Sequence, residues 1–156
     1  MEITVKEGDR FPALRGETQS GDYFDLEDLG GKRKVVYFYP KDNTPGCTIE
    51  ANTFNGALAD FDAANAAVIG VSADSAEDHK SFCDSYGLGF TLVADKDALL
   101  CKELGIYDTL PGFEKFGPFP QRVTFLLDED NVIRRIWVVK DIPNHPAEVL
   151  DALTAL

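Results

Sequence analysis

Residues 37–48 read YFYPKDNTPGCT, a stretch that predicts a buried strand running straight into the start of a helix. The apolar residues before Pro40 predict the strand, and Pro40 ends it because proline has no N–H for a sheet ladder. Thr44 suits the N-cap of the following helix, and Pro45 suits its first position. Cys47 then falls in the first helical turn, where unpaired backbone N–H groups and the helix dipole favour an anion.

This position predicts a reactive thiolate at Cys47. A free thiol has a pKa of about 8.5, and the thiolate is the form that acts as a nucleophile. We therefore expect the pKa of Cys47 to lie well below that value. The alternative is a small apolar residue packed under the helix start, but packing alone does not call for Thr44 and Pro45 at these offsets.

The same residues carry a resemblance to a known family. Pro40, Thr44 and Cys47 match Pro-x-x-x-Thr-x-x-Cys, which resembles the active-site signature of the peroxiredoxins, and the wording of the stretch resembles their PrxQ branch, also called bacterioferritin comigratory protein. The likeness continues through VIGVSADS at 68–75, FTLVADKD at 90–97 and QRVTFLLDED at 121–130. It implies an α/β, thioredoxin-like mixed sheet covered by helices on both faces, and a thiol peroxidase activity.

The resemblance also assigns partners to Cys47, the peroxidatic cysteine in this comparison. In the family an arginine just before a TFL-like strand sits beside the sulfur, and Arg122 occupies that place. Its guanidinium stays charged and presents several donors in a plane, so it could hold the thiolate and a peroxide oxygen together. The alternative is an arginine held in a salt bridge at a strand end. We expect the Thr44 hydroxyl to reach both sulfur and peroxide, and Pro40 to shield the sulfur from water.

The resolving cysteine departs from the common pattern. Many PrxQ proteins carry it five residues after the first cysteine, where this chain has Asn52. A subset of the family places it on the following helix, which Cys83 fits. Cys101 is flanked by leucines, and we expect a buried, inert thiol there. If neither cysteine serves, the protein is a one-cysteine peroxidase that needs an external thiol.

The rest of the chain alternates between strand and helix patterns. Predicted strands cover residues 11–14, 23–26, 34–39, 67–71, 90–94, 122–127 and 132–139. Predicted helices cover residues 47–61, 75–86, 98–104 and 146–156, and residues 106–121 read as an ordered loop. This order predicts a mixed sheet with helices on both faces, in one domain over residues 1–156. The aromatics of that loop, Phe113, Phe116 and Phe119, either cover the core or form an apolar rim or a subunit contact.

Composition narrows the class of protein. The chain has 156 residues, 44% of them hydrophobic, a net charge of −12 and a pI near 4.4. This acidity opposes binding to nucleic acid or to anionic membranes. No stretch approaches the roughly 18 to 20 apolar residues of a membrane span, and the start lacks a signal-peptide pattern, so we expect a cytoplasmic protein. The resemblance makes a monomer the default.

Metal and cofactor chemistry is not predicted. His79 lies between charged residues on a helix that should be half exposed, and His145 lies in a turn before the last helix; neither has metal-ligand spacing with the cysteines. There is no phosphate-binding glycine loop or dinucleotide fingerprint.

The sequence therefore favours a peroxidase for hydrogen peroxide and organic hydroperoxides, with electrons returned by thioredoxin or a similar dithiol protein. A disulfide reductase would normally carry Cys-x-x-Cys, which is absent among the three cysteines of this chain. The alternative from another class is a non-enzymatic holdase or binding module that uses the aromatic loop.

Overall fold

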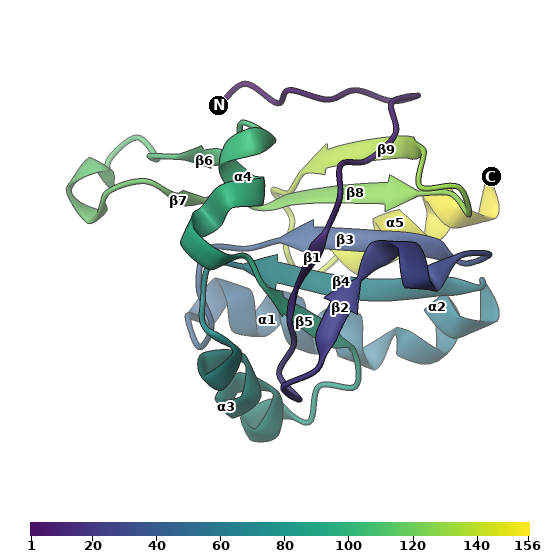
Figure 1. The fold of residues 1–156 in the computed structure, drawn as a ribbon, viewed down its shortest axis with the longest axis horizontal. Helices are drawn as coiled ribbons and strands as arrows, with labels where there is room; N and C mark the ends of the chain where they lie inside the picture. Colours follow the sequence, from purple (N-terminus) through teal and green to yellow (C-terminus); the bar gives the residue numbers. More distant parts are fainter.

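A five-stranded mixed sheet forms the centre of the computed structural model, which describes all residues 1–156 (Figure 1). The sheet order is β5-β4-β3-β8-β9, and β3 is parallel to β4 but antiparallel to β8. The strands are β3 (Arg33–Phe38), β4 (Ala66–Ser72), β5 (Thr91–Ala94), β8 (Val123–Leu127) and β9 (Ile133–Val138). The predicted thioredoxin-like α/β architecture is confirmed.

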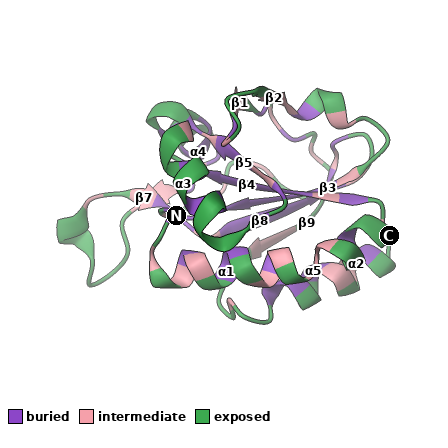
Figure 2. Cartoon of the chain, turned by 90° about the horizontal axis from the view of Figure 1, so that it is seen from below, coloured by how far each residue is buried: buried purple, intermediate pink, exposed green.

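Helices and a small hairpin cover the two faces of this sheet (Figure 2). One face carries α1 (Pro45–Gly56), α2 (Leu58–Ala63), α3 (Ala76–Tyr86) and α5 (His145–Thr154). The other carries α4 (Leu99–Glu103), a 3-10 helix at Leu26–Leu29, and the hairpin of β1 (Arg15–Glu17) and β2 (Tyr23–Asp25). None of the helices is both long enough and apolar enough to cross a lipid bilayer.

The central strand β3 is buried on both faces. Its side chains alternate between two hydrophobic clusters, as the period of two in a strand requires. Val36 and Phe38 enter the cluster under α4, whereas Val35 and Tyr37 enter the cluster under α1 and α3. The end of β3 therefore holds the loop that leads to Cys47 in a fixed place against the core.

The predicted bounds of a strand and of a helix in the first half of the chain need correction. The first strand was expected at residues 11–14, but β1 begins at Arg15, and Phe11 and Leu14 are core residues outside any strand. The single helix expected over residues 47–61 is two helices, α1 and α2, separated at Ala57. Gly56 ends α1, consistent with the low helix propensity of glycine.

The aromatic segment projects from the body of the molecule as an arm (Figure 1). The strands β6 (Tyr107–Asp108) and β7 (Phe119–Pro120) pair at its base, and a 3-10 turn lies at Glu114–Phe116. The prediction of a loop without strands is therefore wrong at the base of the arm. Phe113 and Phe116 are 53% and 65% exposed, so they do not cover the core.

Candidate active site around Cys47

The chain reverses from β3 into α1 and places Cys47 in the first turn of the helix. Pro40 is half-buried just after the strand, and Thr44 is the N-cap residue with an extended backbone. The Thr44 side chain does not cap the helix; its hydroxyl donates to the Lys41 carbonyl oxygen at 2.8 Å. The first N–H groups of α1 thus stay free of this side chain.

Arg122, just before β8, reaches across to this helix start. Its Nη1 atom donates to Glu50 Oε1 on α1 at 3.1 Å, and its side chain is 19% exposed. A Cβ atom added at Gly46 would lie only 2.6 Å from Arg122 Nη2. Glycine at that position therefore lets the guanidinium approach the backbone beside Cys47.

The Cys47 thiol is buried, with 1% of its surface exposed. Burial raises its pKa, and the Arg122 charge, a Thr44 hydrogen bond, the Lys41 backbone and an Arg122 hydrogen bond lower it. Burial is the largest of these effects, and the pKa lies above the ordinary thiol value. The prediction of a lowered pKa is thus wrong for the fully folded site, because removing a thiolate from water outweighs the nearby donors and cation.

Glu50 is a site residue that the sequence reasoning missed. It is completely buried on α1, burial raises its pKa to about 7, and Arg122 opposes that rise. Its Oε2 atom has no hydrogen-bond partner within the chain. A signal was present, because Glu50 lies three residues after Cys47 and four before Phe54, on the inward face of the helix.

Cys83 lies on α3, in the same buried cluster as Cys47. It is 7% exposed, and its thiol is free, as is that of Cys47. Burial raises the pKa of Cys83 to about 11; Asp42 and Asp84 raise it further, whereas Lys80 lowers it. The two cysteines thus face one core region from two separate helices.

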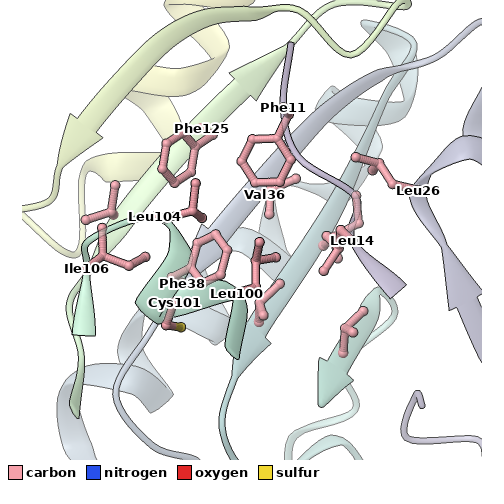
Figure 3. Close-up of a cluster of buried hydrophobic side chains, with 14 of the residues drawn as sticks. Phe11, Leu14, Leu26, Val36, Phe38, Leu100, Cys101, Leu104, Ile106 and Phe125 are labelled. Atoms are coloured by element: carbon pink, nitrogen blue, oxygen red, sulfur yellow. The ribbon is translucent and has the colours of Figure 1, made fainter. Parts of the chain in front are cut away.

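Cys101 lies on the opposite face of the sheet. It packs beside Leu100, Leu104 and Ile106 in the cluster that Figure 3 shows, and none of its surface is exposed. Burial and the Asp95 carboxylate both raise its pKa far above the ordinary value. Its surroundings are those expected of a structural thiol.

His79 contradicts the prediction of a half-exposed side chain. It is completely buried, since it shares the inward face of α3 with Phe82 and Cys83, three and four residues later. Its Nδ1 atom lies 2.6 Å from Asp42 Oδ2, and its Nε2 atom lies 3.1 Å from the Val93 carbonyl oxygen. The charged neighbours in the sequence point to solvent and misled the prediction.

Asp42, Asp74 and His79 are close enough to suggest a metal site, with candidate ligand atoms within 4.8 Å of one another. Those atoms already have protein partners, however. Asp42 accepts from the Tyr39 hydroxyl at 2.6 Å, and Asp74 Oδ2 accepts from the Ser72 hydroxyl at 2.6 Å and from the Asp42 amide at 2.9 Å. A closed hydrogen-bond network accounts for this cluster without a metal ion.

A model described as the AhpC/TSA family matches residues 7–136. Peroxiredoxin Bcp of Xanthomonas campestris is 38% identical over 143 residues, covering 92% of this chain and 87% of that protein. Chloroplastic peroxiredoxin Q of Sedum lineare is 38% identical over 153 residues, covering 97% of this chain and 80% of its own length.

Solved structures agree with these sequence matches. A cysteine-to-serine variant of Xylella fastidiosa PrxQ superposes with a TM-score of 0.91 at 35% identity, covering 99% of this chain and 98% of that one. The bacterioferritin comigratory protein of Xanthomonas campestris, solved as a trapped intermediate/ligand complex in work on its alkyl peroxide reduction activity, gives 0.85 at 34% identity, with coverage of 99% and 98%.

Proposed function

The chain belongs to the AhpC/TSA family, in its peroxiredoxin Q and Bcp branch, and is a thiol peroxidase; from this premise we propose that Cys47 is the thiol that attacks the peroxide. Hydrogen peroxide and organic hydroperoxides are the proposed substrates. The observation that carries the assignment is the convergence of Arg122, Thr44 and the first turn of α1 on this sulfur. Pro40 is proposed to shield the sulfur from bulk water.

In the first step the thiolate attacks the terminal oxygen of the hydroperoxide. An S–O bond forms, the O–O bond breaks, and the proton lost by the thiol ends on the departing oxygen as water or alcohol. The sulfur is oxidised by two electrons to a sulfenic acid. Negative charge moves from sulfur to the leaving oxygen. We propose that Arg122 stabilises it, together with Thr44 once the hydroxyl proton turns from the Lys41 carbonyl toward the reacting atoms.

The raised pKa of Cys47 gives Arg122 and Thr44 a second proposed role, which is to increase the fraction of thiolate. A buried thiol is mostly protonated at neutral pH, so the reaction draws on a minor thiolate fraction. Arg122 and Thr44 both lower the pKa of Cys47, and each therefore enlarges that fraction. Their loss would lower the rate both through the thiolate population and through the charge on the oxygens.

In the second step we propose that Cys83 attacks the Cys47 sulfenic acid, forming a disulfide and releasing water. A disulfide needs Cα atoms within about 7 Å. Both cysteines are buried within helices, so we expect the start of α1 and part of α3 to open first. Thioredoxin or a similar dithiol protein would return two electrons. A one-cysteine cycle with an external thiol is the alternative, and a cytoplasmic monomer stays a prediction.

Peroxide consumption with dithiothreitol tests the assignment of Cys47. Cys47→Ser should reduce the rate to that of the reagents alone, because no other thiol has the same cation and donors. Cys101→Ser is the matched control and should keep the wild-type rate. Equal rates for wild type and Cys47→Ser would overturn the proposal and favour a non-enzymatic binding or holdase role.

A further inference from the structure

The His79 side chain is buried, and both of its ring nitrogens face oxygen atoms. Its Nδ1 atom lies 2.6 Å from a carboxylate oxygen of Asp42, and its Nε2 atom lies 3.1 Å from the Val93 carbonyl oxygen. The Tyr39 hydroxyl donates to the second oxygen of Asp42 at 2.6 Å. His79 and Asp42 thus form a closed hydrogen-bonded pair, with side chains 0% and 3% exposed.

The His79–Asp42 pair joins the two segments that carry the proposed catalytic cysteines. His79 lies on α3, four residues before Cys83 and on the same inward face. Asp42 lies in the loop between β3 and α1, five residues before Cys47. The Asp42 amide is held in turn by Asp74 Oδ2 at 2.9 Å. The one other hydrogen bond between side chains of this loop and of α3 is the longer contact of the Tyr39 hydroxyl with His79 Nδ1, at 3.5 Å.

We propose that the His79–Asp42 pair is a latch that must break before Cys47 and Cys83 can form a disulfide, and that His79 acts as a positioning residue for the resolving step. The inference rests on the proposed role of Cys83. While closed, the latch keeps the loop before Thr44 in place against α3. Opening releases the loop and α3 together.

The physical reason is the cost of separating a buried hydrogen-bonded pair. A polar group that loses its partner while it is still buried is strongly unfavourable, because it has neither the partner nor water. When α3 opens locally, His79 moves toward water and its hydrogen bond to Asp42 breaks, so Asp42 loses this partner. The latch therefore slows resolution, which prolongs the life of the sulfenic acid and its exposure to a second peroxide molecule.

The test compares His79→Gln with His145→Gln. His145 is the matched control, since it is also buried and hydrogen-bonded, to Thr124 Oγ1 at 2.8 Å, but lies on α5 away from the latch. Hydrogen exchange of the reduced proteins should be at least tenfold faster in His79→Gln for peptides covering both residues 40–50 and 76–86. In His145→Gln these peptides should exchange as in wild type.

Rapid mixing with peroxide then separates the two steps. His79→Gln should form the sulfenic acid within about twofold of the wild-type rate and the Cys47–Cys83 disulfide at least tenfold faster. Unchanged exchange, or an unchanged disulfide rate, would overturn the latch. If wild type forms no Cys47–Cys83 disulfide, the proposed role of Cys83 is wrong, and so is the proposal that the latch controls the resolving step. Hydrogen exchange of the reduced proteins, which needs no peroxide, still tests whether the loop and α3 open together.

A second variant guards against a first that does not fold. Asp42→Asn keeps the shape of the side chain but weakens its contact with His79, and it should accelerate both exchange and disulfide formation, as His79→Gln does. Wild-type exchange and a wild-type disulfide rate in a folded Asp42→Asn would overturn the latch.

Discussion

Cys47 on α1 and Cys101 on α4 are both buried thiols, and they lie on opposite faces of the central sheet. Only 1% of the surface of Cys47 and 0% of that of Cys101 is exposed. Burial raises the pKa of each. At Cys47 a guanidinium and several hydrogen-bond donors oppose the rise, whereas at Cys101 the Asp95 carboxylate adds to it. Exposure therefore does not distinguish the two thiols, and the sign of the neighbouring charge does.

Removing the cation at Cys47 should have the largest effect. Arg122→Met keeps an apolar stem and loses the charge and donors, so the rate of oxidation by hydrogen peroxide should fall by about 100- to 1000-fold. Quenched-flow oxidation followed by mass spectrometry measures this rate. Arg135→Met is the control, because Arg135 is exposed and lies over the Trp137 ring at 4.8 Å, and it should change the rate less than twofold. If Arg122→Met lowers the oxidation rate by less than threefold, the Arg122 charge does not account for the reactivity of Cys47.

Glu50 is the buried acid that pairs with Arg122, the cation present at Cys47 and absent at Cys101. Its pKa is raised to about 7 in the folded protein, against about 4.3 in an unfolded chain. Between these values the folded state binds more protons, so the stabilisation is complete below the unfolded pKa and is lost as pH rises through 7. The full loss is on the order of 3 to 4 kcal/mol in the free energy of unfolding.

Urea unfolding at pH 5 and pH 8 measures this dependence. Other groups contribute to the pH dependence in both proteins, so the difference between wild type and Glu50→Gln isolates the Glu50 contribution. The variant should lose much less stability than wild type between the two pH values. The same loss in both would show that Glu50 is not protonated in the folded state.

The Thr44 hydroxyl should matter less than the cation. Thr44→Val removes the hydrogen bonds of the Thr44 hydroxyl to Cys47 and to the Lys41 carbonyl oxygen, and it keeps the shape of the side chain. The rate of oxidation of Cys47 should fall by about 10- to 100-fold. Thr53→Val is a control on the same helix, since the Thr53 hydroxyl bonds only to backbone oxygens of α1, at 2.9 and 3.0 Å. If the two variants react at the same rate, the Thr44 hydroxyl has no part in the chemistry.

The smallest effect on the reaction is expected at Cys101. Cys101→Ser places a hydroxyl in an apolar core, which should lower the free energy of unfolding by about 1 to 3 kcal/mol. The rate of peroxide reduction should stay within twofold of wild type. A larger loss of rate in a folded Cys101→Ser variant would show that Cys101 takes part in the reaction, contrary to the prediction.

The sequence predicted the parts of this site that follow from local rules. The strand before Pro40, the N-cap position of Thr44 and the first-turn position of Cys47 depend on residues within one segment, and the structure has them. The arginine was found only through a family resemblance, because nothing local to residues 121–130 connects Arg122 with Cys47.

The missed features depend on partners that are distant in the sequence. Glu50 and Arg122 are 72 residues apart, and His79 and Asp42 are 37 apart. A charged residue type predicts a solvent-facing position unless its partner is known. The pKa of Cys47 was predicted with the wrong sign for a related reason, since the burial that raises it comes from tertiary packing of the hydrophobic cluster to which Cys47 belongs.

The most direct test of the account is peptide mapping after one equivalent of hydrogen peroxide, without reduction. The account predicts one intramolecular disulfide, between Cys47 and Cys83, with Cys101 left as a free thiol. Cys83→Ser should instead retain an oxidised Cys47 that proceeds to the sulfinic acid when more peroxide is added. A disulfide between Cys47 and Cys101, or an intact Cys47 thiol after the peroxide is consumed, would contradict the account.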